Sequence, residues 1–458
     1  MQGVTLLVSI IGSALVIVLR PAYGLAVCLG ALIWYPNYLR ISIGTIDISA
    51  ARIVLPVLLL RCLMDGRIYK RFTWSRLDTW VAVSMAVYVG MYLLTRPLEM
   101  GVENRGGFLM DTWLAYMCAR LVITDQAALA RVIKIVAVLL SVLAVLTVIE
   151  SATHHYFFYS LVRFRPWDMD ADNPLEQPMG RWGFYRGLGP FSHSIMLGMC
   201  FAMFLPLIWA LRRERGDWRV LAYPLSVLVV LGAFSSMSSN PWMMVIFIIF
   251  ALAMEKRRHW VKPLLAMLVV LLLGLEVASN RHFYHVLFQY MNPVGGDWWQ
   301  RAKLMDCAIE SIGEWWLRGY GGRDPGWGPK LGMAFVDLNN EFILAGVEYG
   351  IWGVIVFCTV LGLAFQQLCK VYRLSKDPVT RSWIWALGVA LAGVIVSLQG
   401  VSLFGQNVTL FYCLLGFIGS SGNLVESPDE SRVWATDRAL LSPTEEVRRI
   451  VPDVHAAE

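Results

Sequence analysis

The first candidate for chemistry is the segment Arg181-Trp-Gly-Phe-Tyr-Arg186-Gly-Leu-Gly-Pro-Phe-Ser-His193, which leads directly into an apolar run. Two arginines five residues apart precede a glycine-rich turn. The planar guanidinium group matches phosphate oxygens, and a helix N-terminus adds backbone donors. The pattern therefore predicts a docking point for a diphosphate. The alternative is that the arginines simply extend toward lipid head groups. His193 is either a base or a hydrogen-bonded core histidine.

A second polar segment, Ser235-Ser-Met-Ser-Ser-Asn240-Pro-Trp242, separates two apolar runs. Ser and Asn cap helices, and Pro is suited to a first helical turn. Capping is the default interpretation of this turn. A contact between Asn240 and a substrate is the second.

A long polar stretch near residues 280–340 concentrates aromatic and charged side chains. We expect a helix over Trp298–Leu317, capped by Asp297 and followed by a flexible Arg318-Gly-Tyr-Gly-Gly hinge. Tryptophan faces stack on sugars, and tryptophan also anchors at the bilayer interface. The stretch holds these residues of interest: His282, His285, Trp298, Trp299, Arg301, Lys303, Asp306, Glu310, Glu314, Trp315, Trp316, Arg318, Arg323, Asp324 and Trp327.

This stretch closes with Asp337-Leu-Asn339-Asn-Glu341 and then enters an apolar run that contains Glu348. Glu341 and Glu348 are seven residues apart, so a helix places them on nearly one face. Asp337 lies one turn earlier. Ionisable groups are costly inside a membrane and tend to be functional there. The competing interpretation is helix capping by Asp337 or Asn339.

The composition identifies the surroundings of these residues. Only 72 of 458 residues are charged (39 Lys/Arg plus 33 Asp/Glu), 57% are hydrophobic, and the mean hydropathy is +0.57. Soluble domains average about 25% charged residues. A soluble protein and a disordered chain are therefore both excluded, and a polytopic membrane protein is predicted.

The predicted fold is all-α, because a run of about 20 apolar residues spans a bilayer as a helix. We expect about 12–13 transmembrane helices. The first two runs are separated only by Arg20-Pro21, which leaves one long broken span or two short ones. The predicted spans are 4–19, 22–38, 46–64, 78–94, 107–123, 130–149, 191–211, 220–237, 241–254, 263–279, 341–368, 382–400 and 404–420.

Basic residues predict the orientation. Four short loops, near residues 61–76, 212–219, 256–262 and 370–381, are rich in Lys and Arg and fall on one side. Positive loops mark the cytoplasmic side. The opposite side then receives the two long loops, 150–190 and 280–340. The transmembrane domain is predicted over residues 1–420. The tail 421–458, with eight acids and four arginines, is predicted to be a disordered cytoplasmic segment.

Several classes of site are not indicated. Seven of the eight cysteines lie in or beside apolar runs, and none has the spacing of a metal site or a disulfide framework. No Walker loop, Rossmann fingerprint, HExxH or GxSxG motif occurs. We therefore expect no cofactor, no metal and no nucleic acid partner.

Taken together, these segments resemble the O-antigen ligase and polysaccharide polymerase superfamily of bacterial inner-membrane proteins. The resemblance covers most of the chain. Its first motif, similar to R-x-x-G-P-F-x-H, is matched by Arg186, Gly189–Phe191 and His193. Its second is the Ser238–Pro241 turn. Its third combines the Arg301 helix, the Gly319/Gly321 hinge and the helix entry at Asp337–Gly353.

Two departures from the family pattern favour its polymerase-like branch. Ligases usually carry an arginine in the second motif, where Ser239-Asn240 stand here. They also usually carry a His-Asn pair where the late helix begins, where Asn339-Asn340 stand here. A polymerase-type Asp-x-Asn arrangement would be Asp337 and Asn339.

The resemblance implies metal-independent glycosyl transfer at the periplasmic face of the inner membrane. The donor would be a polyprenyl-diphosphate-linked glycan. Membrane lipid and other polysaccharide synthesis or export proteins would be the further partners. Arg186, with Arg181 or Arg301, would neutralise the diphosphate. His193, Asp337 or Glu341 would take the hydroxyl proton, and Asn339 would orient a sugar hydroxyl. Asn240, Trp298, Trp299 and Arg318 are further candidate contacts.

Two other functional classes remain as alternatives. One is a transporter or flippase of lipid-linked sugars, which would need polar groups through the bilayer centre. The other is an inactive scaffold of a polysaccharide synthesis complex, because the two departures remove residues that the ligases use.

Overall fold

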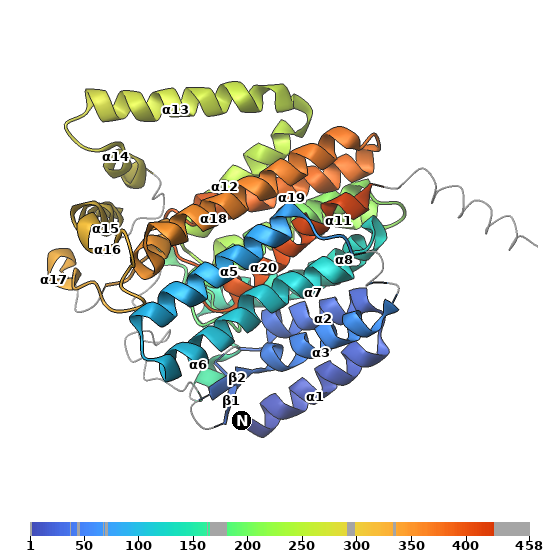
Figure 1. The fold of residues 1–458 in the computed structure, drawn as a ribbon. Coiled ribbons are helices and arrows are strands. Elements are labelled where there is room, and N and C mark those ends of the chain that lie inside the picture. Colours follow the sequence, from blue (N-terminus) through green and yellow to red (C-terminus); the bar gives the residue numbers. More distant parts are fainter. Residues whose placement is uncertain are drawn as a thin grey trace, which may run out of the picture.

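The computed structural model describes residues 2–36, 38–43, 46–66, 68, 72–162, 164, 181–290, 298–332 and 336–425. Its architecture is a bundle of helices with one short two-stranded hairpin (Figure 1). The N-terminal elements are α1 Gln2–Val18, α2 Pro21–Trp34, β1 Arg40–Ile43, β2 Ile46–Ser49, α3 Ala50–Met64, α5 Arg76–Thr95, α6 Leu98–Leu109, the π-helical turn η1 Met110–Leu114, α7 Ala115–Val122, α8 Gln126–Thr153 and α9 Tyr159–Val162.

The remaining elements carry the chain through the second half of the bundle. They are η3 Arg181–Gly183, α10 Ser194–Ala210, η4 Leu211–Arg213, α11 Trp218–Ser235, α12 Ser239–Ala253, η5 Met254–Trp260, α13 Val261–Ala278, α14 Phe283–Tyr290, α15 Trp298–Glu310, α16 Ile312–Trp315, α17 Gly328–Leu331, α18 Glu341–Leu374, α19 Pro378–Ser397, α20 Gln406–Gly419 and η6 Ser420–Leu424.

The predicted helical membrane fold is confirmed in its main features. Seven helices of the described chain are long and apolar enough to cross a membrane. One of them, Ser239–Ala278, contains a kink at Arg257 that divides it into α12 and α13. The apolar runs near the N-terminus form two separate helices, α1 and α2, which pack on each other across the Arg20-Pro21 junction.

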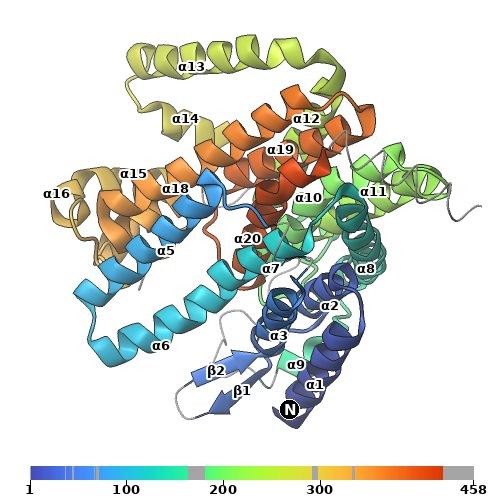
Figure 2. The same ribbon diagram turned by 45° about the vertical axis from the view of Figure 1, so that its right-hand side comes forward.

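Helix α10 forms the centre of the bundle. Almost all of its residues are buried, and it packs against α11, α12 and α19. Close packing is possible because Gly198 receives Pro241 and Gly232 of α11 receives Phe201. Helix α13, in contrast to α10, is not packed inside the bundle. It has no buried residue and lies apart from the bundle in both views (Figures 1 and 2). An apolar helix without protein around it is suited to lipid.

Contacts between distant segments define two ends of the bundle. The basic end joins the positively charged loops. There Arg212 pairs with Glu255, Arg258 hydrogen-bonds Tyr372, and Trp383 donates to Glu214 at 3.1 Å. The opposite end, called the loop end below, joins the two long loops. The contacts at the basic end join three of the four basic loops predicted to lie on one side, those near residues 212–219, 256–262 and 370–381.

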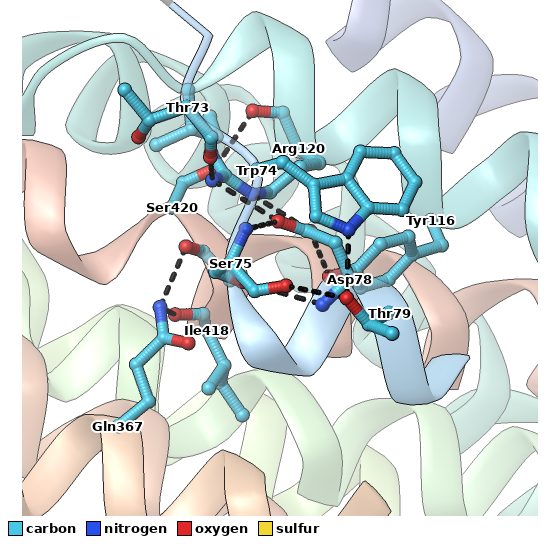
Figure 3. A network of polar contacts seen from close by, with 12 residues as sticks. Thr73, Trp74, Ser75, Asp78, Thr79, Tyr116, Arg120, Gln367, Ile418 and Ser420 are labelled. Atoms are coloured by element: carbon cyan, nitrogen blue, oxygen red, sulfur yellow. Dashed lines mark hydrogen bonds and ion pairs between the residues drawn. The ribbon is translucent and has the colours of Figure 1, made fainter. Parts of the chain in front are cut away.

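A buried polar network closes the basic end (Figure 3). Asp78 and Arg120 are both buried and form an ion pair at 3.1 Å. Tyr116 donates to the same carboxylate at 2.5 Å, and Asp78 also completes a capping box with Ser75. Because every charge has partners, their mutual attraction and hydrogen bonds offset the cost of desolvation, and the network joins α5 to α7. Ser420 extends it to the last described turn by donating to the Arg120 carbonyl at 2.9 Å.

Three predicted element boundaries were wrong. The span predicted to begin at residue 46 begins at Ala50, because 40–49 forms the β1–β2 hairpin, whose Arg40 pairs with Ser49 in the register (Figure 2). The span predicted at 107–123 starts earlier, at Leu98, and passes through the π-helical turn. The described part of the chain also reaches Val425, with Ser421 fully buried, so the packing extends slightly beyond residue 420. Residues 426–458 and Asp297 lie outside the described residues.

Candidate functional site

The loop end brings together the starts of α10, α12, α18 and α20. The connection from α19 to α20, residues 398–405, runs between them and is held by side chains of several other elements. Asn340 donates to the Gln399 carbonyl at 2.9 Å, and the Glu341 amide donates to the Leu398 carbonyl at 3.1 Å. The connection between two late helices therefore forms the floor of the candidate site.

Asn340 is the N-cap of α18. Its side-chain oxygen accepts the amides of Phe342 and Ile343 at 3.0 and 3.2 Å. Capping was anticipated at this helix entry, but Asp337 or Asn339 was expected to supply it. Asn340 does so because it directly precedes the first helical residue, where a short side chain reaches the N2 and N3 amides.

Glu341, the first residue of α18, is half-buried. Its Oε2 accepts the Leu403 amide at 2.6 Å, and no described residue hydrogen-bonds its Oε1. One oxygen thus positions the side chain, while the other remains available.

Asn240 has a different role from the predicted cap. No side-chain cap bond forms at the start of α12. Instead the Asn240 amide donates to the Ser397 carbonyl at 2.8 Å, and its oxygen accepts the Ser397 hydroxyl at 2.6 Å. The second polar turn is consequently attached to the end of α19.

Arg301 of α15 reaches the same place from the second long loop. A Cβ at Gly400 would lie 3.1 Å from Nη1 of Arg301 and 3.1 Å from Nδ2 of Asn240. A side chain at this position would therefore crowd both groups, and the glycine lets them approach closely. Arg301, Asn240 and the floor of the site therefore meet, although 61 residues separate the first two and 99 separate Arg301 from Gly400.

The Arg186 segment is positioned by a carboxylate that the sequence analysis did not single out. Glu150, fully buried at the end of α8, accepts the amides of Leu188 and Gly189 at 3.0 and 2.8 Å. The Gly187 amide donates to the Ser235 carbonyl at 2.9 Å, which places the first motif against the second. The only signal for Glu150 was an acid at the end of an apolar run.

The Arg186 side chain is half-buried, and no described residue hydrogen-bonds or pairs with its guanidinium. Its carbonyl accepts the Tyr156 hydroxyl at 3.0 Å. Burial raises the pKa of Tyr156 to about 12, so the phenol remains a donor at physiological pH. The backbone is thus held in place, and the cationic group is available for a ligand.

His193 is the N-cap of α10. Its Nδ1 accepts the Ile195 amide at 3.1 Å. A neutral imidazole that accepts at Nδ1 carries its proton on Nε2. In this arrangement the ring acts as a donor at Nε2, and the role of proton acceptor falls to the carboxylates.

Three amide side chains near the floor contain buried polar atoms. Of these three residues, only Asn339 was predicted from the sequence. Both side-chain heteroatoms of Gln406, Oδ1 of Asn407 and Oδ1 of Asn339 are buried without a hydrogen-bonding partner among the described residues. A buried unpaired polar atom costs about 1–3 kcal/mol. Gln406 and Asn407 open α20, directly after the 398–405 connection.

The other predicted residues are less enclosed. Asp337, Trp299 and Arg318 are exposed at the loop end. The backbone of Arg181 and Trp298 is helical, but their side chains lie outside the described part of the structure. The structure thus brings together Arg301, Asn240, Asn339 and Glu341, places the Arg186–His193 segment beside them, and leaves Arg318 and Trp299 on the surface.

No group of three or more His, Cys, Asp or Glu side chains with metal-binding geometry occurs among the described residues. Comparison with protein-family models gives no match, and comparison with curated proteins gives none either.

Proposed function

We propose that this protein is a membrane-embedded glycosyltransferase of the O-antigen ligase or polysaccharide polymerase type, acting on a polyprenyl-diphosphate-linked glycan. The observation that carries the proposal is the packing of Arg301 beside Asn240 on Gly400, at the entry of α18. It joins a cation from the second long loop to the amide and carboxylate groups at the helix ends. This is the combination that diphosphate departure and hydroxyl activation require.

The donor half of the reaction uses the arginines. Attack of an acceptor hydroxyl on the anomeric carbon breaks the bond to the diphosphate oxygen. Negative charge then develops on the polyprenyl diphosphate. Arg186 and Arg301 neutralise this charge, and His193 donates from Nε2. Fixed donors stabilise such charge better than water because they need no reorganisation.

The acceptor half uses the entry of α18. Glu341, oriented through Leu403, takes the proton of the attacking hydroxyl at its second oxygen, with the exposed Asp337 as the other carboxylate in reach of the loop end. Asn339 orients a neighbouring hydroxyl. The leaving lipid diphosphate stays in the membrane, which accounts for a site where helices and loops meet.

The setting completes the proposal. The basic end faces the cytoplasm of a bacterial cell with its C-terminal tail, and the loop end faces the periplasm, in accordance with the positive-inside rule. With thirteen membrane spans, α1 and α2 counted separately, the four basic loops and the C-terminal tail fall on the same side of the membrane. Other polysaccharide synthesis or export proteins would supply and remove the glycan.

The test compares arginines of the loop end. Clean deletion should leave flipped, unpolymerised lipid-linked units, and complementation with Arg301→Ala or Arg186→Ala should restore less than about one hundredth of polymer formation, as expected for loss of a charge-stabilising donor. Arg318→Ala is the matched control, because this exposed arginine should be dispensable. Gel ladders and extracted lipid-linked intermediates provide the measurements. Normal polymer in both variants would refute the proposal.

A transporter is the alternative with one observation in its favour. Helix α18 is interrupted at Gly350, and interrupted helices form many transport sites. Here, however, the Tyr320 and Gly321 amides donate to the Val347 and Glu348 carbonyls freed by the break. The interruption thus accommodates a loop. Accumulation of unflipped units in the deletion strain would favour transport instead.

A further inference from the structure

A cavity of ≈ 540 Å³ lies outside the candidate site, between α14, α15 and the turn that follows α13. Small-molecule sites commonly measure about 300–1,000 Å³. The side chains that line it and bear on its chemistry are Arg281, His282, Tyr284, His285, Asp306 and Ile309.

Asp306 organises the wall of this cavity. Its Oδ1 accepts the Tyr284 hydroxyl at 2.5 Å and lies 3.1 Å from Nε2 of His285. An ionised carboxylate only accepts, so Nε2 is the donor, and in the neutral imidazole Nδ1 is left as an acceptor. Burial also raises the pKa of Tyr284, which keeps its hydroxyl protonated. Asp306 thus fixes the orientation of the His285 ring, as a hydrogen bond to one ring nitrogen commonly does.

The charges at the cavity balance. Arg281 and Asp306 carry opposite charges, Glu310 is paired with Lys330 at 3.2 Å, and Nδ1 of His282 lies 2.7 Å from the Glu276 carboxylate of α13. The wall therefore offers donors and acceptors in similar measure without a net attraction for phosphate. An uncharged, hydroxyl-rich ligand fits this surface better than an anion.

Helix α15 connects the cavity to the candidate site but faces them with different sides. Arg301 contacts Gly400, whereas Asp306, five residues later, lines the cavity. Five residues rotate a helix position by about 140°. One rigid helix thus holds two separate surfaces at the loop end.

We propose that the cavity between α14 and α15 is a second saccharide-binding site, which holds an uncharged part of the glycan chain away from the transfer site, with His285 accepting a sugar hydroxyl. The identity of the ligand as part of the glycan rests on the proposed function. Holding the chain at a second point raises the local concentration of its reactive end.

The experiment uses two isoleucines of similar exposure. Ile309, 54% exposed, lines the cavity, and Ile312, 50% exposed, is not among its lining residues. The probe is the neutral oligosaccharide released by mild acid from the host's lipid-linked glycan. Its binding to the full-length protein in lipid nanodiscs is measured by saturation-transfer NMR. Ile309→Trp, whose larger side chain narrows the cavity at its lining, should weaken binding at least tenfold, and Ile312→Trp should leave it unchanged.

Two further variants keep the result interpretable. His285→Gln should also weaken binding, so the outcome does not depend on the folding of Ile309→Trp. Lys303→Ala, at an exposed position of α15 outside the lining of the cavity, should bind the free oligosaccharide as the wild type does. Unchanged binding in both cavity variants, or displacement of the oligosaccharide by inorganic diphosphate, would overturn the inference. Failure of glycan transfer by the wild-type protein would instead refute the proposed function, since the binding assay involves no transfer.

Discussion

Three arginines at the loop end have different surroundings. Arg301 packs on Gly400 beside Asn240, Arg186 is half-buried without a described partner, and Arg318 is exposed. From the sequence, Arg186 and Arg301 were expected to neutralise the diphosphate, whereas Arg318 was a further candidate contact. Their environments separate a group positioned at the floor of the site from one on the surface.

The buried Gln406 provides a prediction at the residue scale. Because neither of its side-chain heteroatoms has a described partner, Gln406→Met should leave thermal stability unchanged or raise it by up to about 1–3 kcal/mol. Gln367→Met is the matched control. Its amide donates to the Ile418 and Gly419 carbonyls at 3.0 and 2.7 Å, so its removal should lower stability. Thermal unfolding of the detergent-purified protein measures both. An equal loss in the two variants would show that Gln406 is hydrogen-bonded through ordered water.

At the scale of the element, the interruption of α18 organises the second long loop. The Ile351 amide donates to the Trp316 carbonyl at 2.7 Å, and Gly319 packs on the Glu348 carbonyl, where a Cβ would approach to 2.5 Å. Arg96, the C-cap of α5, adds two hydrogen bonds to the Gly321 and Gly322 carbonyls at 2.8 and 2.6 Å. The glycine-rich hinge predicted after Arg318 is therefore clamped between two helices.

The conformation of Gly350 makes this clamp testable. Its φ of 69° and ψ of −171° belong to a region that is essentially restricted to glycine, and a Cβ would lie 2.7 Å from the Leu317 carbonyl oxygen. Gly350→Ala should therefore cost about 1–3 kcal/mol or more and increase proteolysis of the 311–332 segment. Gly362→Ala, in the same helix with open space around its Cβ position, should be neutral or stabilising. Equal behaviour of the two alanines would contradict the assignment.

At the scale of the whole molecule, the two ends of the bundle are built for different tasks. At the basic end, polar groups are paired with each other, as in the Asp78–Arg120–Tyr116 network (Figure 3). At the loop end, several polar atoms have no described partner. Paired groups stabilise the arrangement of helices, whereas unpaired ones are free to bind a ligand.

The basic-end network should behave as a stability element. Arg120→Met leaves the fully buried Asp78 without its cation, and removal of one partner of a buried pair typically costs about 3–5 kcal/mol. The double variant Asp78→Leu/Arg120→Met should recover part of this loss, because it removes the unpaired charge. Thermal unfolding provides the measurement. Oligosaccharide binding at the loop end should persist wherever the protein remains folded. A single variant as stable as wild type would contradict this role.

The sequence by itself determined the helical membrane architecture, the grouping of basic loops and most helix positions, because hydropathy, helix propensity and charge act over short stretches of chain. It also selected Asn240, Arg301 and Glu341, since polar residues are rare in such a chain. Tertiary structure alone decided that Arg301 meets Asn240 on Gly400, that Glu150 anchors the Arg186 segment, that His285 meets Asp306 and that α18 is interrupted at Gly350. These contacts join residues far apart in sequence or depend on backbone angles that a neighbouring loop imposes, and no local pattern encodes either.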